Sequence, residues 1–77
     1  MVSFVSYVLR FKNDDSAIGD VARDMAVDPA INKRWCYLTL VKHLLQMNAS
    51  ERVYEILANA RTAYILDRIF IVKLDLD

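Results

Sequence analysis

The segment from residue 14 to residue 29 most constrains the fold, because it contains the only glycine and the only proline of the chain. Asp15 or Ser16 would begin a helix by accepting hydrogen bonds from its free N–H groups. Pro29 would end that helix, since it restricts Asp28 to extended backbone. Between these ends, apolar residues recur at helical spacing: Ile18, Val21, Ala22 and Met25. The segment therefore predicts one helix with a defined start and a defined end.

The single glycine, Gly19, falls in the first turn of this predicted helix. Glycine costs roughly 1 kcal/mol relative to alanine inside a helix. Its presence there predicts that another stretch of backbone passes close by.

Apolar spacing predicts three further helices. One covers residues 3–11 and has an apolar face of Phe4, Tyr7, Val8 and Phe11. The next covers residues 33–47, and its buried face is expected to contain Trp35, Leu38, Leu40, Val41, Leu44, Leu45 and Met47. Its solvent side is expected to contain Thr39, His43 and Gln46. These helices make the chain all-α.

A fourth helix follows Asn48–Glu51, a capping box with asparagine in the serine position. Its core face is predicted to contain Val53, Ile56, Leu57, Ala60 and Tyr64. We expect one bundle over residues 1–67 and a C-terminal tail over residues 68–77. The apolar residues of the tail form a candidate interface: Ile69, Phe70, Ile71, Val72, Leu74 and Leu76. Alternating apolar and charged residues from 72 to 77 favour a strand, whereas the period of the fourth helix would carry on through Leu66 and Phe70.

Composition excludes several classes of function. The chain has ten basic and ten acidic residues, so its net charge of zero gives no overall attraction to nucleic acid or to a membrane surface. Apolar runs such as residues 69–72 are far shorter than the ~20 residues that cross a bilayer. One glycine allows no glycine-rich phosphate loop. One histidine and one cysteine cannot form a zinc tetrad. We expect no metal, no cofactor and no enzymatic activity.

The residues also resemble a known family, the YozE-like family of short bacterial proteins. The likeness runs over residues 3–65 and is strongest in Ile18–Asp24, which reads Ile-Gly-Asp-Val-Ala-Arg-Asp. It includes Ser3-Phe4 with Tyr7 and Leu9, Asp28-Pro29, Leu44, Asn48–Glu51, Ala60 and Tyr64. The resemblance implies a four-helix fold similar to sterile alpha motif domains, which mostly mediate protein association and sometimes bind nucleic acid.

Charge is unevenly divided along the chain. Residues 1–32 carry three basic residues against five aspartates, a net charge of −2, and residues 33–61 carry five basic residues against two glutamates, a net charge of +3. A candidate acidic face consists of Asp20, Asp24 and Asp28. A candidate basic face consists of Lys33, Arg34, Lys42, Arg52 and Arg61. The alternative is that all these charges are ordinary solvated surface.

Two functions remain open. The first is a non-enzymatic protein–protein interaction module of a bacterium or its mobile element, which binds a protein partner or a second copy of itself. The alternative is a small nucleic-acid-binding regulator that uses the basic 33–61 half. A lone Cys36 and the lack of a secretory signal at the N-terminus predict a cytoplasmic location.

Overall fold

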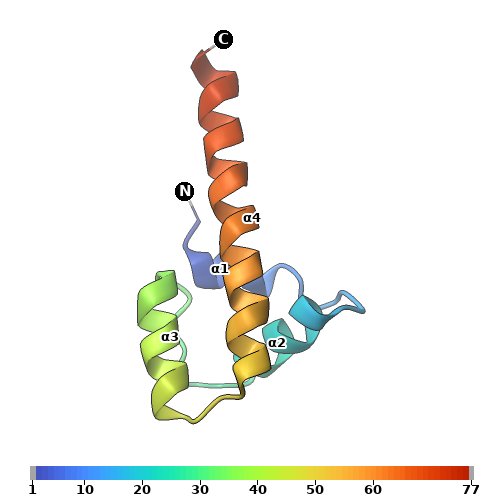
Figure 1. Ribbon diagram of the computed structural model, residues 1–77, viewed down its shortest axis with the longest axis vertical. Helices are drawn as coiled ribbons and strands as arrows, with labels where there is room; N and C mark the ends of the chain where they lie inside the picture. Colours follow the sequence, from blue (N-terminus) through green and yellow to red (C-terminus); the bar gives the residue numbers. More distant parts are fainter. Residues whose placement is uncertain (1, 77) are drawn as a thin grey trace.

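Four helices make up the part of the chain that the structure describes. The computed structural model describes the backbone of residues 2–76 and the side chains of residues 2–67. The helices are α1 (Phe4–Leu9), α2 (Ala17–Ala26), α3 (Tyr37–Gln46) and α4 (Glu51–Leu76), and no strand occurs among the described residues. Figure 1 shows α1, α2 and α3 gathered around the N-terminal half of α4, which runs the length of the molecule. The predicted all-α bundle is therefore confirmed.

Helix α1 depends on the connection between α2 and α3. Ser3 caps α1, because its Oγ accepts a hydrogen bond from the N–H of Ser6 at 3.1 Å. The N–H of Val5 donates to the carbonyl oxygen of Trp35 at 3.3 Å. Helix α1 has six residues and buries four of them: Phe4, Val5, Tyr7 and Val8.

Helix α2 agrees with its prediction at both ends. Ser16 Oγ accepts a hydrogen bond from the N–H of Gly19 at 3.2 Å, and the helix ends at Ala26, before Pro29. A Cβ atom on Gly19 would overlap the carbonyl oxygen of Asp14 and would lie 3.1 Å from the carbonyl oxygen of Phe11. The expected close approach of a second backbone segment is therefore present, and it is the connection from α1.

Helix α3 differs from its prediction in both its start and its buried face. It begins at Tyr37, four residues after the expected start at residue 33. Leu40 is fully buried, whereas Leu38, Leu45 and Met47 are 60–66% exposed. The predicted burial of these three residues is wrong. The apolar side chains of α3 occupy most of its circumference, whereas the neighbouring segments cover only the side that contains Leu40.

The junction between α3 and α4 also corrects the sequence interpretation. Asn48 has a φ of 56°, in the left-handed region. Its N–H donates to the carbonyl oxygen of Leu45 at 3.3 Å, and the N–H of Ala49 donates to the carbonyl oxygen of Leu44 at 3.1 Å. These two bonds form a Schellman motif, which ends α3. Asn48 therefore ends α3, and it is not the N-cap residue of α4, which begins at Glu51.

Helix α4 crosses the expected boundary at residue 67 without a break and ends at Leu76. Of the two interpretations of the tail, the helix is correct and the strand is wrong. With 26 residues, α4 is about 39 Å long at 1.5 Å per residue, close to the longest dimension of the molecule, 44 Å.

The core lies where α1 meets the other helices. The ring of Phe4 packs edge-on against Tyr37 and Tyr64, with centroid distances of 5.3 and 5.5 Å. Leu57 of α4 is fully buried, and the partly buried residues Val53, Ile56, Ala60 and Tyr64 pack on the same core, as predicted. Burial of a side chain such as Phe4 or Leu57 stabilises the fold by about 1.5–3 kcal/mol.

Candidate functional site

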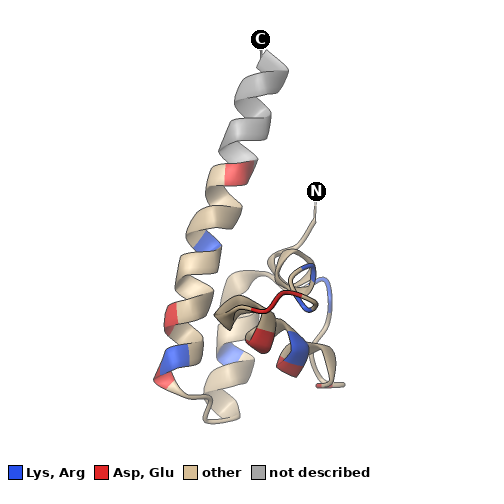
Figure 2. Cartoon of the chain, turned by 90° about the vertical axis from the view of Figure 1, so that its right-hand side faces the viewer, with Lys and Arg blue, Asp and Glu red and all other residues tan. Residues whose placement is uncertain are grey.

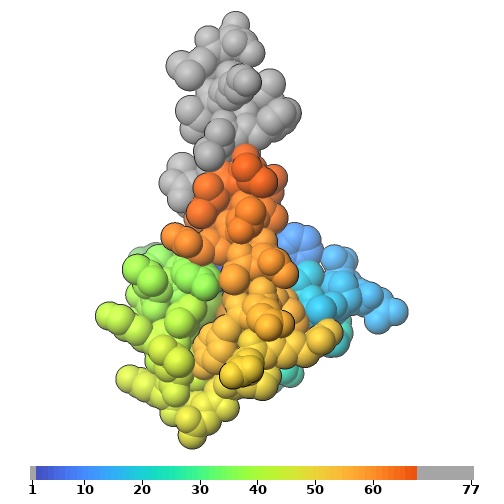
Figure 3. All heavy atoms as spheres, in the orientation of Figure 1, coloured from blue at the N-terminus to red at the C-terminus, as the bar shows by residue number. Residues whose placement is uncertain are grey.

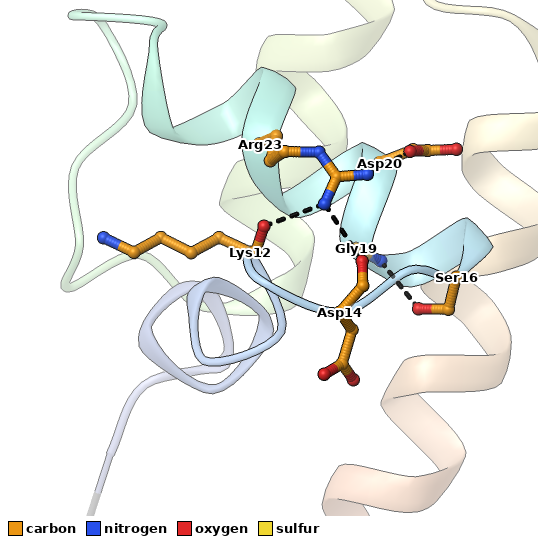
Figure 4. A network of polar contacts seen from close by, with 6 residues as sticks. All are labelled: Lys12, Asp14, Ser16, Gly19, Asp20 and Arg23. Carbon is orange, nitrogen blue, oxygen red and sulfur yellow. Dashed lines mark hydrogen bonds and ion pairs between the residues drawn. The ribbon is translucent and has the colours of Figure 1, made fainter.

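The candidate acidic residues have different surroundings. Asp20 and Asp24 lie on α2, and Asp28 lies beyond the end of that helix. Asp20 forms an ion pair with Arg23. Nη1 of Arg23 also donates to the carbonyl oxygens of Lys12 and Asp14, each at 2.9 Å. Figure 4 shows this guanidinium reaching from α2 to the connection that precedes it. Asp20 therefore pairs with the arginine that holds the connection before α2, whereas the side chain of Asp24 is exposed.

Asp28 is paired with His43. Nε2 of His43 lies 2.9 Å from Oδ2 of Asp28, and the two side chains are only 13% and 25% exposed. Oδ1 of Asp28 accepts a hydrogen bond from the N–H of Ala30 at 2.9 Å. The hydrogen bond from His43, followed by that from Ala30, lowers the pKa of Asp28 below its usual value.

His43 was expected on the solvent side of α3, and that prediction is wrong. The ring of Trp35 covers it, with the two ring centroids 5.4 Å apart. Asp28 and His43 are fifteen residues apart, so no local pattern could have indicated the pair.

The candidate basic residues lie on three different parts of the molecule. Lys33 and Arg34 belong to the connection before α3, Lys42 lies on α3, and Arg52 lies in the first turn of α4. Arg61 of α4 covers the ring of Tyr37, with its guanidinium carbon 4.9 Å from the ring centroid. Figure 2 shows basic and acidic segments interspersed along the chain.

A hollow in the surface brings together basic residues from the two halves of the sequence. Its volume is about 430 Å³, and it is lined by Arg10 and Lys12 from the N-terminal half together with Lys33. Leu9, Met25, Ala26 and Ile31 supply apolar lining, and Ser6 and Asp28 complete it. Neither Arg10 nor Lys12 was among the residues predicted for the basic face.

A second exposed feature is the outer face of α3, which we define as Leu38 and Leu45. These two side chains are 66% and 60% exposed, and Met47, the C-cap residue after the helix, is 62% exposed. Leu38 and Leu45 are seven residues apart and so lie on one side of the helix. In Figure 3, α3 forms one flank of the molecule beside α4.

Cys36 is the N-cap residue of α3, and its side chain is exposed. Its Sγ lies 3.4 Å from Oγ1 of Thr39. Hydrogen bonds from the side chain and then the backbone of Thr39 lower the pKa of the Cys36 thiol.

Tyr7 lies at the contact between α1 and α4. Burial raises its pKa, and the nearby carboxylate of Asp67 raises it further. The apolar candidates of the tail, residues 69–76, have side chains outside the described residues.

Among the described residues, no group of three or more His, Cys, Asp or Glu side chains is placed to hold a metal ion. None of the helices in the described part of the chain has both the length and the apolar character needed to cross a bilayer. Comparison of the chain with protein-family models, curated proteins and solved structures finds no match.

Proposed function

We propose that this chain is a non-enzymatic protein-association module that docks through the outer face of α3. The observation that carries the proposal is the exposure of Leu38 and Leu45, which share one side of α3, on a domain of only 77 residues. A bundle of this size has little apolar surface to spare, because chains of this length bury only about 60% of the surface of their unfolded form. Contact with a second protein would remove these side chains from water.

Other features support association over catalysis. The single histidine is already paired with Asp28 and covered by Trp35. The resemblance of residues 3–65 to the YozE-like family, and through it to sterile alpha motif domains, is consistent with an association role. A cytoplasmic location in a bacterium or its mobile element belongs to the same proposal and rests on that resemblance and on the single cysteine.

The decisive experiment is light scattering of the purified chain from low to high micromolar concentration. Self-association through α3 predicts a mass that rises with concentration and stays monomeric in a Leu38→Lys/Leu45→Lys variant. Thr39→Lys/Gln46→Lys is the matched control, because it adds the same charge at exposed positions of the same helix. A chain that is monomeric throughout would reject self-association. A protein partner captured from the host must then lose binding to the first variant and retain binding to the control.

Nucleic-acid binding through the basic 33–61 half is the alternative proposal. It predicts a gel shift with random DNA or RNA at low salt that weakens steeply as salt rises. The absence of a shift at low salt would reject it.

A further inference from the structure

The hollow beside α1 combines an apolar floor with a basic rim. We call it the basic hollow and define it by Leu9, Met25 and Ile31 on the floor and by Arg10, Lys12 and Lys33 on the rim. A cavity of about 430 Å³ has room for one or two side chains of a ligand. A neighbouring hollow is lined by Lys33 and Arg34, so basic residues continue along this side of the molecule.

The backbone that carries the rim is held in place. The carbonyl oxygen of Lys33 accepts hydrogen bonds from Ser3 Oγ and, at 2.9 Å, from Ser6 Oγ. The carbonyl oxygen of Lys12 accepts one from Arg23 Nη1 at 2.9 Å. Figure 4 shows the amino group of Lys12 directed away from the contacts of Arg23. A ligand would therefore meet a backbone that is already ordered, which lowers the entropic cost of binding.

The positive charge of the rim is not neutralised from within. Among the described residues of the lining, Asp28 is the one that is acidic, and its two carboxylate oxygens already accept hydrogen bonds from His43 and from the N–H of Ala30. Arg10, Lys12 and Lys33 form no ion pair with any side chain of residues 2–67. The lining thus carries three positive charges against one engaged carboxylate.

These observations favour one class of ligand. A negatively charged group would meet the rim, and an apolar group beside it would fill the floor. The lining residues that the structure describes include no aromatic side chain, so they offer no platform on which a nucleic-acid base could stack. We propose that the basic hollow binds a segment of a partner protein in which acidic residues adjoin leucine-like side chains.

This site is separate from the outer face of α3. None of its lining residues belongs to α3. The basic hollow would therefore be a second contact, with a partner segment of different chemistry. The two proposals can fail separately, because self-association through α3 is measured by light scattering and binding in the basic hollow is measured with a peptide.

The test uses an acetylated peptide, Asp-Leu-Glu-Leu-Asp, titrated into the isotopically labelled full chain and followed by NMR. We expect chemical-shift changes centred on Leu9, Met25 and Ile31, and binding that weakens as salt screens the charges. Lys12→Glu/Lys33→Glu should lower the affinity at least tenfold. Lys42→Glu/Arg52→Glu, which makes the same change of net charge on α3 and α4, should lower it less than twofold.

Several results would overturn the proposal. One is equal loss of affinity in the two variants, which would mean that net charge alone attracts the peptide. Another is a set of shifts away from the hollow, or equal binding of the peptide Lys-Leu-Lys-Leu-Lys. Tighter binding of a thymidine oligonucleotide at the same residues would assign the hollow to phosphates. If the charge-reversed variant fails to fold, Lys12→Gln/Lys33→Gln takes its place, with the same expected direction of change.

Discussion

Nε2 of His43 lies 2.9 Å from Oδ2 of Asp28, so a carboxylate that follows α2 anchors the last turn of α3. The pair is shielded by the ring of Trp35. The same carboxylate holds the turn after α2 through the N–H of Ala30. The side chain of Asp28 therefore joins the connection after α2 to α3, which makes its ionisation a factor in stability.

The first prediction concerns acid. The pKa of Asp28 is lower in the folded chain than its usual value of 3.8, so the folded state favours the carboxylate. The resulting stabilisation is present above about pH 4 and is lost as the pH falls through the folded-state pKa. Asp28→Asn should therefore be less stable than the wild type at pH 6, and the difference should narrow below about pH 4.

Urea unfolding at a series of pH values measures this effect. Asp24→Asn provides the control, because it removes the same charge at an exposed position of α2. A pH profile of Asp28→Asn that runs parallel to that of the wild type down to acid would contradict the role of the pair.

The second prediction concerns Gly19. Alanine normally stabilises a helix by about 1 kcal/mol relative to glycine. At this position its Cβ would overlap the carbonyl oxygen of Asp14, so we expect Gly19→Ala to lower the free energy of unfolding by about 1–3 kcal/mol. Asn59→Ala on the exposed side of α4 is the control, where the helix preference of alanine acts unopposed. A gain in stability from Gly19→Ala would show that the two segments are not in contact.

The third prediction separates two roles for Asn48. In the left-handed region a side chain other than glycine or asparagine costs about 1–2 kcal/mol. Asn48→Gly should therefore preserve or raise the melting temperature, and Asn48→Ser should lower it. Serine is a good N-cap residue, so an unchanged melting temperature in Asn48→Ser would instead support the capping role expected from the sequence.

The fourth prediction compares two leucines of α3. Leu40 is fully buried and Leu45 is 60% exposed. Leu40→Ala should lower the free energy of unfolding by about 2–5 kcal/mol. Leu45→Ala should change it by no more than about 0.5 kcal/mol in the monomer. Chemical denaturation at low protein concentration measures both values, and similar losses would mean that the other side of α3 faces the core.

The fifth prediction concerns Cys36. Because Thr39 stabilises the thiolate, Thr39→Val should raise the thiol pKa and slow alkylation by iodoacetamide at neutral pH. The pH at which the alkylation rate is half-maximal should rise with it. Thr62→Val, which removes a hydroxyl from α4, should leave this pH unchanged. Identical profiles for the two variants would rule out the contribution of Thr39.

The parts of the fold that follow from local signals could be predicted from the sequence. Ser16 marks the start of α2, Gly19 marks its close contact with the preceding connection, and Pro29 follows its end. The aromatic and valine residues of α1 likewise identify its buried side. Each of these signals lies within about two helical turns of the feature that it predicts, so the packing of remote segments does not have to be known.

The parts that depend on remote neighbours could not be predicted. Leu38, Leu40 and Leu45 are equally apolar, and the positions of α1 and α4 decide which of them is covered. The basic hollow combines Arg10 and Lys12 with Lys33, which lies more than twenty residues later. Asn48 fits two different motifs, and only its backbone angle decides between them.

The hydroxyl of Ser3 serves two partners at once. It accepts from the N–H of Ser6 within α1 and donates to the carbonyl oxygen of Lys33, thirty residues away. A helix of six residues is not stable on its own in water. The hydrogen-bonded amides of α1 are therefore expected to lose their protection against deuterium exchange once the segment around Lys33 and Trp35 opens, because that segment accepts hydrogen bonds from the start of the helix.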